Sequence, residues 1–273
     1  MSICGVIVIY NCDIEDILHN VDSVYRQVDH LLIVDNSEDN IREGKFREHF
    51  NNISFYFNGN HYGIAGALNY ALKFAQSHGY DYLLTMDQDS RLEDDSVKEL
   101  LNLLIENNLA MIGPNVYKKY GSGNVSDINL LITSGSLVNV EIADKIGGFN
   151  NDLFIDLVDL EFCLRMKQNG YKYGFARDIK MSHNIGEQRV FKRFGITKKM
   201  SYHSANRYYY IFRNNIIVRK LYRKYSPSYS LKLWIASLIN RFNIMFYPKN
   251  ERVIIKENIK RSKKDAKVYL AEA

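Results

Sequence analysis

The sequence predicts an α/β fold with a mostly parallel, doubly wound sheet, followed by a basic helical extension. Apolar runs of strand length alternate four times with segments of helical spacing between residues 3 and 107. Near residue 188 the composition shifts to a tail that is rich in basic and aromatic residues. We therefore expect a body of residues 1–188 and an extension of residues 189–273.

Each predicted strand is a short apolar run that ends in a polar turn. These runs lie at residues 3–10, 31–34, 53–57, 82–86, 110–117 and 171–176. Apolar residues spaced three and four apart, or a short polar segment, predict the helices. These lie at residues 14–24, 41–50, 64–76 and 94–107, with a fifth that closes at Asn169–Gly170 and two longer ones at about 201–224 and 230–247.

Length and cysteine content narrow the class of protein. The 273 residues leave room for one large domain and an appendage. The three cysteines, at positions 4, 12 and 163, form no CxxC pair, which favours free thiols in a reducing compartment. Residues 3–10 resemble a first core strand rather than a signal peptide, and no apolar run reaches the roughly 18 residues of a membrane span. We expect a cytoplasmic protein.

Charge is distributed unevenly along the chain. Residues 1–188 hold 15 Lys and Arg against 27 Asp and Glu, whereas residues 189–273 hold 21 against 4, for a net charge of +5. A strongly basic tail predicts an anionic partner, such as a phospholipid surface or a nucleic acid. The alternative is a set of solvated helix faces.

Two carboxylates follow the fourth predicted strand. Asp87 and Asp89 flank Gln88 directly after the apolar run 82–86. At the carboxyl edge of a parallel sheet they would lie where α/β proteins bind ligands, and such oxygens suit a divalent cation that bridges to phosphate. The alternative is a solvated turn that contains an Asx hydrogen bond.

Two further features point to the same edge. Asp35 ends the second strand, where a carboxylate would meet a nucleotide base or ribose. Residues 60–69, Asn-His-Tyr-Gly-Ile-Ala-Gly-Ala-Leu-Asn, form a glycine-bearing entry into a helix whose amides could approach a ligand.

Five segments in this order resemble an inverting family 2 glycosyltransferase. The resemblance covers about residues 1–190 and implies the GT-A fold, a Rossmann-like and mostly parallel sheet flanked by helices. Its segments are Val8–Asn11, Ile33–Ser37, Asn60–Asn69, Met86–Ser90 and Asp156–Arg165. Two of these motifs, Gly-Ile-Ala-Gly-Ala-x-Asn at residues 63–69 and Asp-Gln-Asp-Ser at residues 87–90, resemble the rhamnosyltransferase branch of the family.

The resemblance implies a dTDP- or UDP-linked nucleotide-sugar donor and a divalent metal, Mg or Mn. Asp35 would contact the base, Asp87 would face the ribose or support the metal loop, and Asp89 would ligate the metal. His183 falls where related enzymes have a second protein ligand, with a structural histidine as the alternative. The implied donor-binding residues are Tyr10, Asn11, Asp35, Asn60, Gly63, Ala67, Asp87 and Gln88.

The same resemblance implies a carboxylate as the catalytic base. An inverting displacement needs a base to take the proton of the acceptor hydroxyl. Counting back from Arg165, Asp159 takes the family's Asp position and Val158 replaces its Glu, so Asp159 is the first candidate and Asp156 the second. Glu161 is a candidate partner for Arg165 at i, i+4. The alternative is that Asp156 and Asp159 only favour a helix dipole.

The tail carries two further patterns. Residues 204–215 resemble the family's Arg-Tyr-Tyr…Arg-Asn segment, which would meet phosphate or sugar, or else pack the tail. The apolar residues of 231–247, interspersed with Lys232 and Arg241, predict a helix that lies on an anionic membrane surface. That location would suit a polyprenyl-diphosphate-linked acceptor.

Together these features predict an inverting transferase that moves L-rhamnose from dTDP-rhamnose to a polysaccharide or lipid-linked saccharide, peripheral on the inner face of the cell membrane. A UDP-sugar donor is the first alternative. A nucleotidyltransferase would need a glycine-rich basic signature after the first strand, which Tyr10–Asp13 does not provide. A non-catalytic module that binds RNA or a membrane has support only from the tail. We expect no nucleic acid partner, and the oligomeric state stays open.

Overall fold

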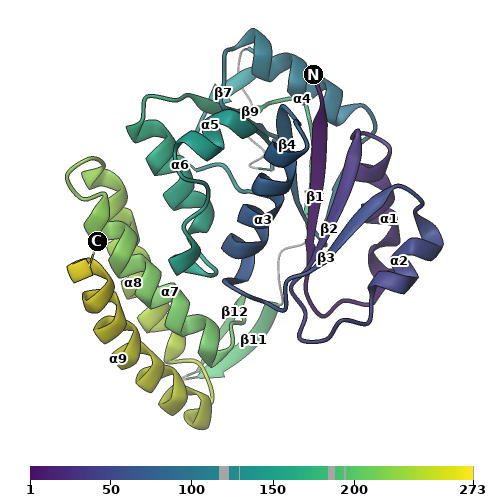
Figure 1. The fold of residues 1–273 in the computed structure, drawn as a ribbon. Helices are drawn as coiled ribbons and strands as arrows, with labels where there is room; N and C mark the ends of the chain where they lie inside the picture. Colours follow the sequence, from purple (N-terminus) through teal and green to yellow (C-terminus); the bar gives the residue numbers. More distant parts are fainter. Residues whose placement is uncertain (117–122, 129, 184–187, 194, 273) are drawn as a thin grey trace. The chain divides into compact units, whose positions relative to one another are not determined.

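The computed structural model describes residues 1–116, 123–128, 130–183, 188–193 and 195–272 (Figure 1). The chain forms two compact units. The first contains residues 1–154 and 158–184, and the second contains residues 155–157 and 185–273. The tripeptide 155–157 is therefore grouped with the C-terminal unit, although its neighbours on both sides belong to the first.

A mixed sheet forms the centre of the first unit. Within the described ranges its eight strands have the order β3-β2-β1-β4-β8-β6-β9-β7, and β3, β2, β1 and β4 run parallel, as predicted. Strand β8 runs antiparallel between β4 and β6. The strands are β1 (Ile3–Ile9), β2 (His30–Asp35), β3 (Ile53–Phe57), β4 (Tyr82–Asp87), β6 (Met111–Gly113), β7 (Val125–Asp127), β8 (Ser136–Asn139) and β9 (Tyr173–Ala176).

Burial explains why the first strands could be recognised in the sequence. All seven residues of β1 are buried, because a central parallel strand is covered on both faces and therefore appears as one continuous apolar run. The expected strand at 110–117 is shorter, since β6 ends at Gly113. The next residue, Pro114, has no N–H with which to continue a ladder.

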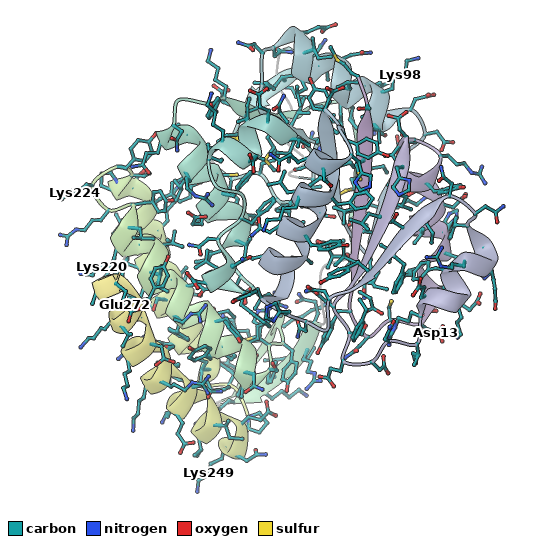
Figure 2. The ribbon with its side chains drawn as sticks, in the orientation of Figure 1. Asp13, Lys98, Lys220, Lys224, Lys249 and Glu272 are labelled. Atoms are coloured by element: carbon teal, nitrogen blue, oxygen red, sulfur yellow. The ribbon has the colours of Figure 1, made fainter. Side chains whose placement is uncertain are left out.

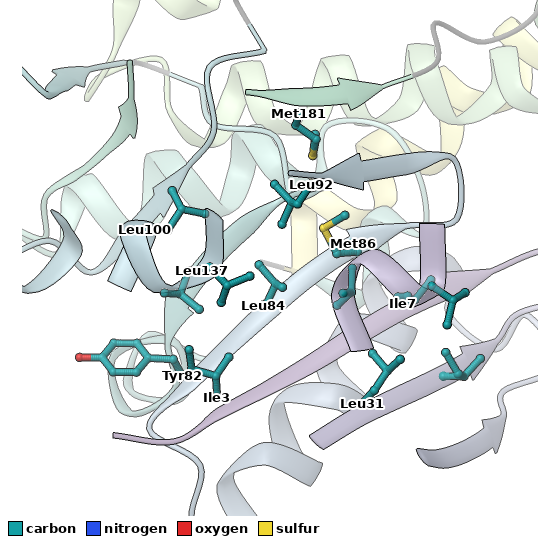
Figure 3. Packing of buried hydrophobic residues seen from close by; sticks show 14 of the residues in the cluster. Ile3, Ile7, Leu31, Tyr82, Leu84, Met86, Leu92, Leu100, Leu137 and Met181 are labelled. Carbon is teal, nitrogen blue, oxygen red and sulfur yellow. The ribbon is translucent and has the colours of Figure 1, made fainter. Parts of the chain in front are cut away.

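Helices cover both faces of this sheet. Helices α1, α2 and α4 share a core with alternate residues of the strands, including Ile7, Leu31 and Leu84 (Figure 3). Helix α3 packs on the opposite face, against β1, β2 and β4 (Figure 1). The helices are α1 (Ile14–Tyr25), α2 (Glu43–His49), α3 (Gly63–Ser77), α4 (Ser96–Glu106), α5 (Val140–Lys145) and α6 (Val158–Gln168), with a 3-10 turn at Asn151–Leu153.

A small ribbon lies beside the main sheet in the same unit. Strand β5 (Ser90–Leu92) pairs antiparallel with β10 (Met181–His183). Ser90 lies opposite His183 in this pair. The ribbon therefore brings the segment around His183 next to the turn that follows β4.

The second unit is a hairpin followed by three helices. The hairpin strands are β11 (Gln188–Arg193) and β12 (Ile196–Ser201), and the helices are α7 (Ala205–Leu221), α8 (Pro227–Ile244) and α9 (Lys249–Glu272). Tyr208 and Tyr247 are both fully buried in the aromatic core of the second unit. The Tyr208 hydroxyl donates a hydrogen bond to the Tyr247 hydroxyl at 3.2 Å. Lys220, Lys224 and Lys249 are exposed (Figure 2). In the described ranges, no helix is both long and apolar enough to span a bilayer.

Candidate active site

Three neighbouring strands bring predicted donor residues to one edge of the sheet. Ile9 of β1 pairs with Asp35 of β2, and Val8 pairs with Asp87 of β4, so the two carboxylates flank the end of β1. The backbone N–H of Tyr10 donates to Oε1 of Gln88 at 2.7 Å. The parallel register thus gathers residues that lie up to 79 positions apart in the chain.

A hydroxyl supports the turn after β1. The N–H of Asn11, a residue with a φ of 43°, donates to Oγ of Ser37 at 2.7 Å. Ser37 in turn donates its own N–H to Oδ1 of Asp35 at 2.8 Å. The side chains of Tyr10 and Asn11 are exposed, so both are accessible to a ligand at this edge.

Asp35 is buried and retains an acceptor. Its Oδ2 lies 3.5 Å from Nη1 of Arg42 but accepts no hydrogen bond within the described residues. Burial works to lower the pKa of Arg42, but its hydrogen bond to Asp39 and the charge of Asp35 raise that pKa, so the guanidinium stays charged. A buried carboxylate oxygen normally finds a donor. Oδ2 is therefore suited to accept from an N–H group of a bound molecule.

Hydroxyls organise the turn of Asp87, Gln88 and Asp89. The N–H of Asp87 donates to Oγ of Ser134 at 3.0 Å. The Ser134 hydroxyl then donates to Oγ of Ser90 at 2.8 Å, and both serines are buried. Asp87, Gln88 and Asp89 themselves are half-buried. Sequence reasoning missed Ser134, whose signal is a hydroxyl within an apolar stretch.

The donor set suits a divalent cation. The carboxylates of Asp87 and Asp89 are hard oxygen ligands, and the backbone of His183 lies opposite Ser90 in the β5–β10 pair. The side chain of His183 lies outside what the structure describes. Among the side chains that are described, no three His, Cys, Asp or Glu gather into a metal cluster. Two carboxylates fit a cation that takes its remaining ligands from phosphate oxygens and water.

The entry into α3 is a left-handed turn that closes against another part of the same unit. Asn60, Tyr62 and Gly63 have φ values of 57°, 55° and 60°. A Cβ on Gly63 would lie 2.4 Å from the carbonyl oxygen of Phe154. Phe154 therefore occupies the space that the missing side chain leaves. Ala67, farther along α3, is completely buried.

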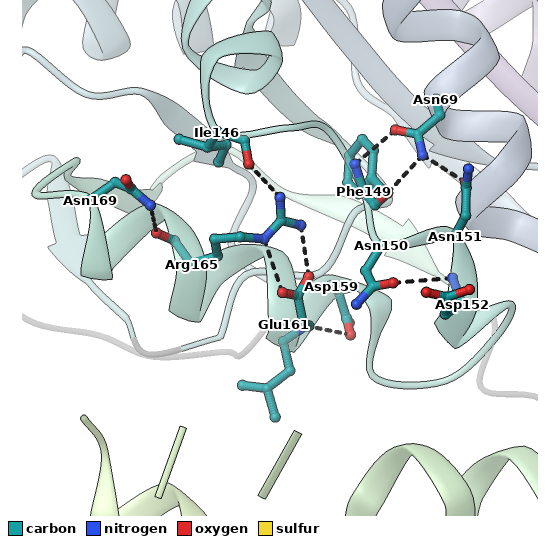
Figure 4. Close-up of polar contacts among 11 residues, drawn as sticks. Asn69, Ile146, Phe149, Asn150, Asn151, Asp152, Asp159, Glu161, Arg165 and Asn169 are labelled. Atoms are coloured by element: carbon teal, nitrogen blue, oxygen red, sulfur yellow. Dashed lines mark hydrogen bonds and ion pairs between the residues drawn. The ribbon is translucent and has the colours of Figure 1, made fainter. Parts of the chain in front are cut away.

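Asn69 performs a task that the sequence did not reveal. Its Nδ2 donates to the carbonyl of Phe149 and to Oδ1 of Asn151, both at 2.7 Å, and its Oδ1 accepts from the N–H of Phe149 at 2.7 Å (Figure 4). A Cβ on Gly148 would lie 2.5 Å from that Oδ1. Asn69 thus fixes the connection that leads to Asp156 and Asp159.

The two candidate bases lie in different units. Asp159 is half-buried in the first turn of α6, where its Oδ1 accepts from the N–H of Leu160 at 2.8 Å. Asp156 belongs to the second unit, where its carboxylate pairs with Arg207 at 3.0 Å. The expected pair of Glu161 and Arg165 is confirmed, with two bonds of 2.9 and 2.8 Å (Figure 4). Arg165 also donates to the carbonyl of Ile146 at 2.6 Å.

Comparison with known proteins relates the chain to sugar transferases. The family model described as Glycosyl transferase family 2 matches residues 4–198. Over 282 aligned residues, the chain is 28% identical to "dTDP-rhamnosyl transferase RfbF" of Shigella flexneri, which covers 94% of this chain and 93% of that protein.

Solved structures resemble the chain in fold. The structure of GalNAc-T7 with UDP, GalNAc and Mn2+ aligns with a TM-score of 0.57 and 12% identity over 67% of this chain. The structure of S. aureus TarS 1–349 aligns with a TM-score of 0.53 and 16% identity over 80% of this chain. The chain spans 43% and 65% of those two solved chains. Their similarity in fold confirms the predicted GT-A architecture.

Proposed function

Because the chain belongs to glycosyl transferase family 2, we propose that it is an inverting transferase that moves L-rhamnose from dTDP-rhamnose to a polysaccharide or lipid-linked saccharide. The observation that carries the proposal is the set of carboxylates at the ends of β2 and β4, in a chain that aligns almost end to end with a relative named for dTDP-rhamnosyl transfer. The identity of the sugar in this proposal rests on that relative, and the reaction chemistry rests on the carboxylates of the site.

The nucleotide is proposed to lie across the ends of β1, β2 and β4. Oδ2 of Asp35 is buried and accepts no hydrogen bond in the described part of the chain, so it can receive an N–H of the base. Tyr10 and Asn11 would border the base and ribose from β1, and Asn60 and Gly63 from the entry into α3. Asp87 would face the ribose, with Gln88 fixed beside it through Tyr10.

A divalent cation is proposed to be held by Asp89, with Asp87 and His183. When bound, it would neutralise charge on the departing nucleoside diphosphate as a Lewis acid. Asp89 stands one residue before Ser90, whose pairing with His183 fixes the backbone directly after the turn. Carboxylate ligands suit Mg and Mn alike, and an imidazole from His183 would favour Mn.

Asp159 is proposed as the general base. In an inverting displacement the acceptor oxygen bonds to the anomeric carbon while the bond from that carbon to the diphosphate breaks on the opposite face. The acceptor hydroxyl must lose its proton, and a carboxylate in the first turn of α6 can take it. The neighbouring acid of that turn, Glu161, is committed to Arg165 by two hydrogen bonds, which disfavours Glu161 as the base.

A UDP-sugar is the alternative donor. Its support is that GalNAc-T7 and TarS 1–349 have both been solved with UDP. An acceptor site for a base N–H, such as Oδ2 of Asp35, does not by itself separate uracil from thymine. The donor must therefore be decided by experiment.

A panel of donors tests the proposal. Hydrolysis and binding of dTDP-rhamnose, UDP-glucose, UDP-galactose, UDP-N-acetylglucosamine and GDP-mannose would be measured for the wild type and Asp89→Asn, with and without Mn. We expect metal-dependent selection of dTDP-rhamnose that Asp89→Asn removes. Selection of a UDP-sugar would show that the protein is a glycosyltransferase with a donor other than dTDP-rhamnose. No response to any donor would contradict both the dTDP-rhamnose and the UDP-sugar proposals.

The acceptor is proposed to be reached at an anionic membrane surface, through α8. Seven apolar residues at helical spacing along α8 and its C-cap are each 43–56% exposed. They are Leu231, Trp234, Ile235, Leu238, Ile239, Phe242 and Met245, and we call them the α8 stripe. A soluble helix surface rarely leaves so continuous an apolar row in water. An interfacial helix has this composition.

Cations adjoin the α8 stripe. Arg219, Lys220 and Arg223 line a cavity of about 360 Å³ together with Leu231 and Trp234 of the stripe. Positive side chains beside an apolar row are suited to phospholipid head groups, because each cation near an anionic surface adds roughly 1 kcal/mol of attraction. This arrangement supports a peripheral location on the inner face of the cell membrane and a polyprenyl-diphosphate-linked acceptor.

A further inference from the structure

The backbone just before α6 is strained. Phe154, Asp156 and Leu157 have φ values of 63°, 66° and 64°. Side chains make this left-handed region unfavourable, so non-glycine residues adopt it only where their surroundings enforce it. Three such residues within four positions therefore require specific support. One peptide bond after Leu157 comes Val158, the first residue of α6, and Asp159 follows.

Asn214 of α7 supplies part of that support. It is completely buried, and its Nδ2 donates to the carbonyls of Ile155 and Asp156 at 2.7 and 2.9 Å. One amide group thus holds two successive carbonyls of the strained segment. A helical asparagine buried in this way is costly unless its hydrogen bonds are made.

Arg207 holds the same segment through its side chain. Its Nη2 lies 3.0 Å from Oδ1 of Asp156, and its Nε lies 3.2 Å from Oδ2. A fork of this kind fixes the direction of a carboxylate as well as its charge. Arg207 and Asn214 are seven residues apart, about two helical turns, so both project from one side of α7.

We propose that Asp156, Arg207 and Asn214 form a positioning cluster that fixes the backbone leading into α6 and thereby orients Asp159. The proposal rests on the role of Asp159 proposed above. It assigns Asp156 a partner in the cluster rather than proton transfer, because the Asp156 carboxylate is already engaged by a guanidinium. In this proposal, Arg207 and Asn214 of the Arg-Tyr-Tyr…Arg-Asn segment bind residues 155–156 of the same chain rather than phosphate or sugar.

Three substitutions at position 156 separate positioning from base catalysis. Asp156→Asn keeps a residue that tolerates positive φ and an oxygen for Arg207, Asp156→Gly keeps only the tolerance, and Asp156→Ala keeps neither. We expect kcat to fall in that order, with Asn within about 5-fold of the wild type. If Asp156 were the base, all three would lose the same factor, about 10²–10⁴-fold. Equal losses would overturn the proposal.

Arg207 provides a test that does not depend on folding, because its side chain is 45% exposed. We expect Arg207→Gln to lower kcat while the KM for the donor changes by less than about 2-fold, and Arg207→Lys to recover part of the loss. Arg207→Gln should also add little to Asp156→Ala, since both remove one interaction. An unchanged kcat, or a rise in donor KM alone, would overturn the proposal.

Hydrogen–deuterium exchange gives a readout that needs no substrate. Asn214→Asp keeps the shape of the side chain but replaces its donating amide with a carboxylate that cannot donate to either carbonyl, so amides of residues 155–160 should exchange faster than in the wild type. Exchange in β1 would serve as the reference. Unchanged exchange in both Asn214→Asp and Arg207→Gln would contradict the cluster. If the wild type transferred no sugar from any donor, the proposed function would fail while this measurement still decided the positioning role.

Discussion

Gly63 and Phe154 are in contact at a point where no larger residue than glycine fits. A Cβ on Gly63 would lie 2.4 Å from the Phe154 carbonyl oxygen and 2.8 Å from Cγ of its ring, and Gly63 has a φ of 60°. Ala65, also in α3, donates its N–H to the same carbonyl at 3.4 Å. The start of α3 and the first residue of the strained segment are thereby held together within the first unit.

We predict that Gly63→Ala is strongly destabilising. Strain at positive φ costs about 1–2 kcal/mol, and overpacking against Phe154 adds about 1–3 kcal/mol. Gly79→Ala is the matched control, because Gly79 also has positive φ, 74°, but nothing within 4 Å of its Cβ position. Free energies of unfolding from urea titration should show the larger loss for Gly63→Ala. Equal losses would mean that the Phe154 contact has no energetic weight.

Asp159→Asn should remove transfer without removing the fold. Loss of a general base slows the proton-transfer step by about 10²–10⁴-fold, while the amide keeps the size of the carboxylate. Initial rates of sugar transfer would measure the effect, with circular dichroism to verify folding. Asp152→Asn, which changes an exposed carboxylate in the preceding turn, should keep the wild-type rate. A wild-type rate for Asp159→Asn would exclude it as the base.

Removing the metal should stop transfer reversibly. Treatment with EDTA is expected to abolish the rate, and added Mn or Mg to restore it, because charge on the leaving diphosphate would otherwise be uncompensated. Titration of Mn²⁺ by electron paramagnetic resonance in the presence of nucleoside diphosphate should show one site that Asp89→Asn weakens. Asp94→Asn, an exposed acid after β5, is the control. Full activity in EDTA would contradict a metal-dependent mechanism.

The sheet was predictable because its strands are buried on both faces. The sequence alone predicts the run Ile3–Ile9 and the polar residues that end β2 and β4, because central parallel strands are continuously apolar. The hairpin β11–β12 was not predicted. Most of its residues are exposed, so Gln188–Arg193 has no alternating apolar face that the pattern could reveal.

The site was predictable only in part. Strand-end residues such as Asp35 and Asp87 carry their own signal, because polar residues interrupt apolar runs. The partners of Asn69, Ser134 and Asn214 could not be predicted, since each bonds to backbone that lies 47 or more positions away. The sequence predicts one apolar surface over residues 231–247, but Leu233, Ile244, Phe246 and Tyr247 are buried in the second unit. They differ from the α8 stripe in packing against the rest of the second unit, and the sequence does not reveal which side of the segment does so.

The three thiols should differ in reactivity in the native protein. Burial raises the pKa of Cys4 and of Cys163 to about 12, so almost no thiolate is present near pH 8. Cys12 is half-buried, and burial also raises its pKa. Alkylation followed by peptide mass spectrometry should therefore label Cys12 first, and Cys4 and Cys163 only as pH rises toward 12 or after unfolding. Early labelling of Cys163 would contradict the buried position described for it.

The α8 stripe should be required for binding to anionic vesicles. Trp234→Ser, Leu238→Ser and Phe242→Ser together remove about half of the apolar surface while leaving every cation in place. Each of these side chains is 45–50% exposed, so their loss should leave folding nearly unchanged. The affinity for phosphatidylglycerol vesicles, measured by co-sedimentation, should fall by at least about tenfold. The reason is that each large apolar side chain contributes roughly 1 kcal/mol or more of binding free energy when the membrane buries it.

A matched substitution distinguishes the α8 stripe from exposed apolar residues in general. Val190→Ser and Val268→Ser alter residues that are 60% and 49% exposed on β11 and α9, and both should bind vesicles as the wild type does. Neutral phosphatidylcholine vesicles should bind the wild type less, since Arg219, Lys220 and Arg223 then have no anionic surface to meet. Binding that is insensitive to both the stripe and the lipid charge would mean that α8 faces another partner, and the membrane proposal would be abandoned.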